Sequence, residues 1–124
     1  MEITQTLRSL GIGRQYLGYS ITVRALQMVL RDENCLFCIK QNIFMPLAEQ
    51  TGSDWRSIER NIRTVIHRAW YINPALLEEM AGYSLERSPT VTEFIEMVSS
   101  YLIRKHPYRM AINAAREQDP HPRR

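Results

Sequence analysis

A row of basic side chains recurs at helical spacing in the segment SDWRSIERNIRTVIHRAW, residues 53–70. Arg56, Arg60, Arg63 and His67 fall within an arc of about 60°, because a helix advances about 100° per residue. Guanidinium groups donate paired hydrogen bonds to guanine edges and also bind phosphates. This basic row therefore predicts a helix face that contacts nucleic acid, although arginine rows on merely solvated helices are also common.

Two polar residues beside the basic row have groups that base reading uses. Glu59 can accept a hydrogen bond from the amine of cytosine, or it can orient a neighbouring arginine. Thr64 can contact a phosphate oxygen or the methyl group of thymine. The opposite side of the same helix is apolar and carries Ile58, Ile62, Val65 and Ala69. We therefore expect one face to pack inward while the other presents hydrogen-bond donors.

The residues just before this helix have the spacing of a helix-turn-helix. Ala48 is followed by Gly52 and then by Ile58. Alanine lets two helices approach closely, and isoleucine packs the second helix onto the first. Glycine occupies the turn, where a side chain would clash or where φ is positive. The spacing predicts a helix-turn-helix over about residues 44–70, with the recognition helix at 54–70 in the major groove of duplex DNA.

The two cysteines form a C-x-x-C in the segment CLFC, residues 35–38. Redox use of this spacing needs a strand–helix–strand setting, and zinc needs two further ligands. Neither accompanies it, and the sequence shows no phosphate loop and no nucleophile beside a base. We therefore expect Cys35 and Cys38 to be half-buried in a helix. We also expect no metal, no cofactor, no small-molecule substrate and no enzymatic activity.

Helical periodicity extends over most of the chain, and strand signals are almost absent. The expected helices cover residues 2–10, 19–31, 35–50 with a kink or break at Pro46, 53–70, 74–82, and a last helix that begins after Thr90. Thr90 and Glu93 fit a capping box at its start. The predicted fold is all-α, a single compact domain of five to seven helices over residues 1–106. Residues 107–124 are polar, and we expect this tail to be partly disordered.

The composition is that of a globular protein with a modest positive charge. Hydrophobic residues make up 44% of the 124 residues, and 16 Lys and Arg outnumber 13 Asp and Glu, for a net charge of +3. Such a charge permits a polyanionic partner but does not require one. The sequence has no signal peptide and no apolar stretch near the roughly 18 residues of a membrane span. We therefore expect a cytoplasmic protein without a membrane partner.

Several segments, in register, resemble the C-terminal DNA-binding effector domain of the sporulation initiation response regulator of endospore-forming Firmicutes. RSIERNIRTVI, followed by HRAW, is similar to that family's S-R-V-E-R-A-I-R-H-A-I, which ends in A-W. Further matches at family spacing are GY at 18–19, MV at 28–29, GYS at 82–84 and PTVTEFIEMV at 89–98. The resemblance covers about residues 11–106.

This resemblance implies an all-α effector domain that binds short promoter boxes in double-stranded DNA, often as tandem dimers, and activates or represses transcription. It assigns DNA contact to Glu59, Arg60 and Arg63, which match the family in type. Ser57 stands where the family has an arginine, although Arg56 is adjacent, and Thr64 stands where the family has a histidine. We expect the recognised box to differ at these two positions.

The family's regulators carry an N-terminal phosphoacceptor receiver domain, whereas this chain begins almost directly on the effector domain. We therefore expect a stand-alone domain that is not phosphorylated by a histidine kinase. The altered contact positions leave a second hypothesis, an interaction module that dimerises with a full-length regulator and modulates it. The predicted DNA-binding residues are Arg56, Ser57, Glu59, Arg60, Arg63, Thr64 and His67, and the predicted structural residues are Ala48, Gly52 and Ile58.

Overall fold

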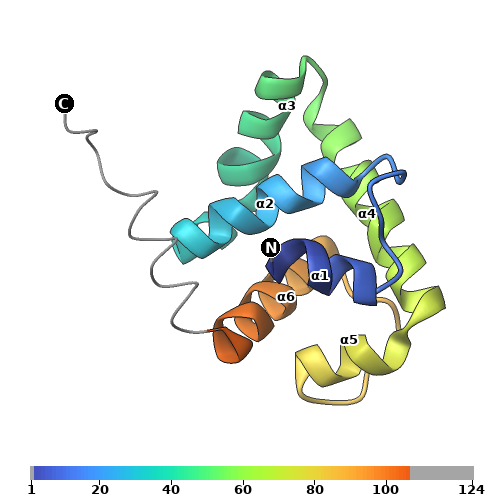
Figure 1. The fold of residues 1–124 in the computed structure, drawn as a ribbon. Helices are drawn as coiled ribbons and strands as arrows, with labels where there is room; N and C mark the ends of the chain where they lie inside the picture. The colour runs from blue at the N-terminus through green and yellow to red at the C-terminus, as the bar shows by residue number, and fades with distance from the viewer. Residues whose placement is uncertain (1, 107–124) are drawn as a thin grey trace.

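The computed structural model describes residues 2–106, and every regular element in that range is a helix (Figure 1). The elements are α1 (Glu2–Ser9), α2 (Tyr19–Arg31), a 3₁₀ turn η1 (Glu33–Leu36), a π-helical turn η2 (Lys40–Phe44), α3 (Met45–Thr51), α4 (Trp55–Ile72), α5 (Pro74–Ala81) and α6 (Val91–Lys105). The predicted all-α class and single compact domain are confirmed. The predicted tail, 107–124, lies outside the described residues.

The core is built around three long helices, α2, α4 and α6, which all contact one another. Leu26, Ile62 and Phe94, one from each helix, are completely buried. α1 packs on α2 and α6, α5 packs on α4 and α6, and α3 stands beside α2 and α4 (Figure 1). As a result α4 is held along one whole side. No helix within residues 2–106 is long and apolar enough to cross a membrane.

The region between α2 and α4 differs from the expected kinked helix. It is divided into η1, η2 and α3, and Pro46 is the second residue of α3, directly after the π-helical turn. The break falls instead at Phe37 and Cys38, and Cys38 has a left-handed backbone with φ +49°. Cys35 is half-buried as expected, but the expectation for Cys38 was wrong. It is exposed, because the chain reverses there instead of continuing as a helix.

The last long helix begins at the predicted capping box. The Thr90 hydroxyl accepts from the Glu93 amide at 3.2 Å, and the Glu93 carboxylate accepts from the Thr90 amide at 2.9 Å. These two bonds satisfy donors that no helical carbonyl can reach. Phe94, Ile95 and Val98 then fall on the completely buried face of α6. The cap therefore sets where this core helix starts.

Candidate nucleic-acid interface

The turn between α3 and α4 occupies residues 52–54. Gly52 has φ +69°, and a Cβ built on it would meet nothing within 4 Å. Of the two reasons considered for glycine here, the left-handed backbone therefore applies and a clash does not. The Ser53 amide closes the end of α3 on the Ala48 carbonyl at 2.9 Å. The Asp54 carboxylate then caps α4 by accepting from the Arg56 amide at 2.8 Å.

One side of α4 is fixed in the core. Its buried residues are Ile58, Ile62, Val65, Ile66 and Ala69. Ala48 of α3 is also buried, so the two helices lie close together at the turn. A helix anchored along this stripe cannot rotate without exposing it, so the opposite side is held toward solvent.

The solvent-facing side of α4 carries the basic row. All four of its members are exposed, and so is Thr64, whereas Ser57 and Glu59 are half-exposed at its margin. The structure therefore places the seven residues of the predicted DNA-binding set on the accessible part of one helix. Rigid presentation from a helix is one arrangement by which side chains reach base edges in the major groove.

The arginines of the basic row have different neighbours. Arg63 pairs with Glu59, with 2.7 Å between Nη2 and Oε2. Arg56 lies over the ring of Trp55, 4.9 Å from its centroid. Arg60 has no ion pair with any described residue. The Glu59–Arg63 ion pair is the contact that the second of the two roles expected for Glu59, the orientation of a neighbouring arginine, would need.

Thr64 uses its hydroxyl hydrogen within the helix. Its Oγ1 donates to the Arg60 carbonyl at 3.1 Å. The exposed side chain keeps its oxygen lone pairs and its methyl group for an outside partner. The thymine methyl contact considered from the sequence therefore needs no rearrangement of this residue, whereas donation to a phosphate would break the bond to Arg60.

Comparison with known families agrees with this geometry. The family model described as the sporulation initiation factor Spo0A C terminal matches residues 3–102. This chain belongs to the Spo0A C-terminal family. The Spo0A C-terminal domain is the DNA-binding domain of a sporulation response regulator, so the chain is assigned to DNA-binding regulation of transcription. The resemblance found in the sequence is confirmed.

The N-terminal end of α4 in this Spo0A-family chain has two features that sequence reasoning missed. Lys40 of η2 lies over the Trp55 ring, with Nζ 4.5 Å from its centroid. The same ring stacks on Phe44 at 6.4 Å between centroids and with an interplanar angle of 1°. Sequence spacing indicated neither contact of Trp55. It carried no signal for Lys40, because that contact depends on how η2 folds back on α4.

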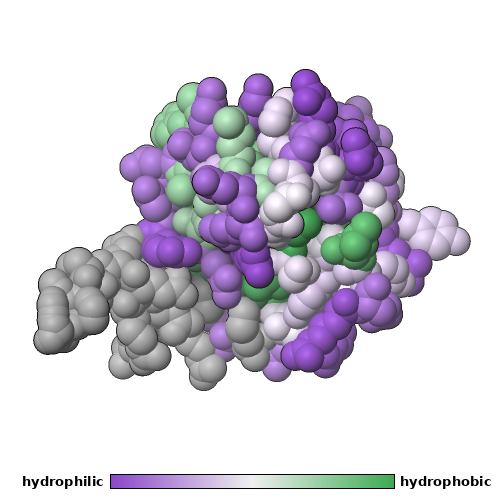
Figure 2. All heavy atoms as spheres, turned by 90° about the horizontal axis from the view of Figure 1, so that it is seen from above, coloured by the Kyte–Doolittle hydropathy of each residue, from purple (hydrophilic) through white to green (hydrophobic). Residues whose placement is uncertain are grey.

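The face seen from above the view of Figure 1 is mixed in character: hydrophilic side chains surround patches of hydrophobic ones (Figure 2). The hollow beside α3 is itself mixed, because Met45, Pro46 and Trp55 line it together with Glu49 and Asp54.

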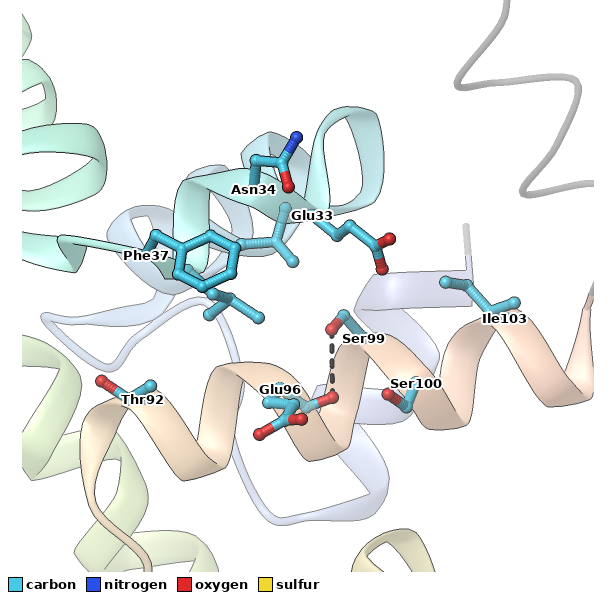
Figure 3. Close-up of a pocket in the computed structure, with 10 residues that line it drawn as sticks. Glu33, Asn34, Phe37, Thr92, Glu96, Ser99, Ser100 and Ile103 are labelled. Atoms are coloured by element: carbon cyan, nitrogen blue, oxygen red, sulfur yellow. Dashed lines mark hydrogen bonds between the residues drawn. The ribbon is translucent and has the colours of Figure 1, made fainter.

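A hollow between η1 and α6 is unsuited to nucleic acid. It has a volume of about 510 Å³, and its lining includes Glu33, Glu96, Phe37 and Ile103 (Figure 3). No lysine or arginine lines it, and its two carboxylates repel phosphate. The cationic face of α4 is therefore the better site in this Spo0A-family domain.

The described residues show no group of three or more His, Cys, Asp or Glu that could hold a metal ion. Partial burial, with Asp32 nearby, raises the pKa of the Cys35 thiol, which disfavours the reactive thiolate.

Proposed function

We propose that this chain binds a specific duplex DNA sequence through a helix-turn-helix formed by α3 and α4, and so regulates transcription from nearby promoters. The observation that carries this proposal is the two-sided character of α4. Arg56, Arg60, Arg63 and His67 are exposed on one side, while the other side is buried in the core. The major groove of B-DNA is about 12 Å wide and admits such a helix.

The contacts within the basic row support a division of roles. Arg60, which has no ion pair among the described residues, is proposed to read a guanine edge. Arg63 is proposed to read a second base, while its ion pair with Glu59 restricts the conformations of the Arg63 side chain. Ser57, Thr64 and His67 are proposed to contact the DNA at the edges of the same groove. The proposed partner is a short promoter box. Where two boxes are adjacent, two copies of the domain are proposed to bind side by side.

Selection of bound duplexes from a random pool, at two salt concentrations, tests the proposal. We expect one enriched motif at both. Arg60→Ala should then cost about 1–3 kcal/mol and relax selection at one base position. Arg24→Ala, an exposed arginine of α2, is the matched control and should leave the motif intact.

A pool that stays flat at both salt concentrations would overturn this function. If a chain that selected no motif bound a full-length Spo0A-type regulator, the interaction-module function would replace sequence-specific DNA binding. Equal motif preference for the parent and the Arg60→Ala variant would remove Arg60 from the base-reading set.

A further inference from the structure

We propose that Lys40 and Arg56, both held on the Trp55 ring, form a clamp for one backbone phosphate of the bound duplex. The three residues are called the tryptophan clamp below. The proposal rests on the proposed function, since the ligand is a phosphate of the same DNA. It adds a contact from η2, outside the two helices of the proposed helix-turn-helix.

The geometry of the clamp brings two cations to one ring. The Lys40 ammonium and the Arg56 guanidinium lie 4.5 Å and 4.9 Å from the Trp55 centroid. Both distances are within the roughly 6 Å at which an aromatic quadrupole attracts a cation. An anion that contacts both cations would offset the repulsion between their like charges.

The ring that carries the cations is itself fixed. Trp55 is half-buried and stacks on Phe44, which is 4% exposed and belongs to the core. Long basic side chains lose about 1.5–2 kcal/mol of rotamer freedom when they are fully ordered. Because the ring restricts both side chains beforehand, part of this cost is already met in the free protein.

The surrounding charges leave both cations available. Neither Lys40 nor Arg56 forms an ion pair with an acid among residues 2–106. Glu49 and Asp54 border the same hollow as Trp55, but the Asp54 carboxylate is engaged with the Arg56 amide as the cap of α4. Because the Asp54 carboxylate already caps the partial positive charge at the start of α4, the attraction of the clamp for phosphate rests on its two side-chain cations.

The test uses the chain as it is and the duplex obtained by selection. Lys40→Gln removes one cation from an exposed position, so folding should be unaffected. We expect affinity to fall about fivefold near physiological salt and the slope of log affinity against log salt to shrink by about 1. The selected motif should not change, because a phosphate contact carries no direct sequence information.

Trp55 is tested as a positioning residue. Trp55→Leu should reduce both the affinity and the salt slope, while Trp55→Phe should retain most of both because it keeps an aromatic face. A purely structural role for Trp55 would lower thermal stability without a matching change in slope. Thermal melts of each variant separate these outcomes.

Lys105 provides the control. It also lies over an aromatic ring, 5.7 Å from the Tyr101 centroid, but in the last turn of α6, well away from α3 in Figure 1. Lys105→Gln should leave the salt slope unchanged. If Lys40→Gln also left the salt slope unchanged while the parent still bound the selected motif, the clamp would be wrong and the proposed function would stand. If the parent bound no duplex, both proposals would fail.

Discussion

Arg60 and Arg63 are one turn apart on α4, and they differ in a single contact with Glu59. The Glu59–Arg63 pair has the favourable order for a helix, with the acid four residues before the base. Half of the Arg63 side chain and a third of the Glu59 side chain remain exposed, so the pair contributes little to folding. We expect its larger effect to be on DNA binding, because it lowers the charge of the face and restricts one arginine.

Replacement of Glu59 by glutamine tests this effect. Glu59→Gln frees Arg63 and removes one negative charge from the face. We expect affinity for unrelated duplexes to rise and the ratio of specific to non-specific affinity to fall, with thermal stability almost unchanged. Binding to the selected duplex and to a scrambled one, compared at two salt concentrations, measures this ratio.

The control for Glu59 is Glu79, an exposed glutamate on α5. Glu79→Gln makes the same change in net charge away from the basic row. An equal change of the specificity ratio in both variants would show that net charge, and not the pairing with Arg63, sets discrimination.

At the scale of elements, the position of α4 depends on a close approach at the start of α2. A Cβ on Gly18 would lie 2.4 Å from the Asn61 carbonyl oxygen and 2.7 Å from a Val65 methyl group. Gly18 has φ −83°, which any residue can adopt, so space and not backbone conformation requires glycine here. The carbonyl belongs to α4 itself and cannot move unless the helix moves.

Gly18→Ala is therefore expected to displace α4 from the core. The expected loss of stability is about 1–3 kcal/mol, as for other overpacked interiors, together with weaker binding to the selected duplex. Urea unfolding measures the first effect and a binding titration the second.

Gly13 serves as the comparison, because its Cβ would meet only the movable end of the Gln15 side chain. Gly13→Ala should cost clearly less stability than Gly18→Ala and leave binding intact. Similar costs for the two variants would show that the approach of α2 to α4 adjusts freely.

At the scale of the whole molecule, periodicity was enough to predict the fold class and the long helices. The bounds of α2 and the capping box of α6 match, because apolar spacing and a local hydrogen-bond pair specify them. The segment from Phe37 to Phe44 could not be predicted, since a left-handed residue and a π-helical turn break the pattern that helix prediction relies on.

The same distinction applies to the candidate site. The exposure of the basic row could be predicted, because it depends only on the helical period within one helix. The contact of Lys40 with Trp55 and the space beneath Gly18 depend on how separate segments pack, and no local pattern encodes them. Tertiary contacts of this kind become visible only in the structure.

The acid stability of the whole domain is predicted to depend on Glu93. Its carboxylate accepts two hydrogen bonds from Arg87, at 3.0 and 3.2 Å, and one from the Thr90 amide. The Arg87 hydrogen bonds, followed by the Thr90 amide, lower the pKa of Glu93 from its ordinary value of 4.5 to about 2. The folded state therefore favours the ionised carboxylate.

A lowered pKa in the folded state stabilises the protein above the unfolded pKa, and this contribution is lost as the pH falls from 4.5 toward about 2. Glu93→Gln should remove that part of the pH dependence. Because 41% of the Glu93 side chain is exposed, solvent screening makes the effect smaller than the pKa change alone implies. Urea midpoints of both proteins, measured across this pH range, should differ above pH 4.5 and converge near pH 2. Glu86→Gln, at an exposed glutamate of the loop before α6, should follow the parent. A parallel offset of Glu93→Gln at every pH would instead assign Glu93 a role in capping alone.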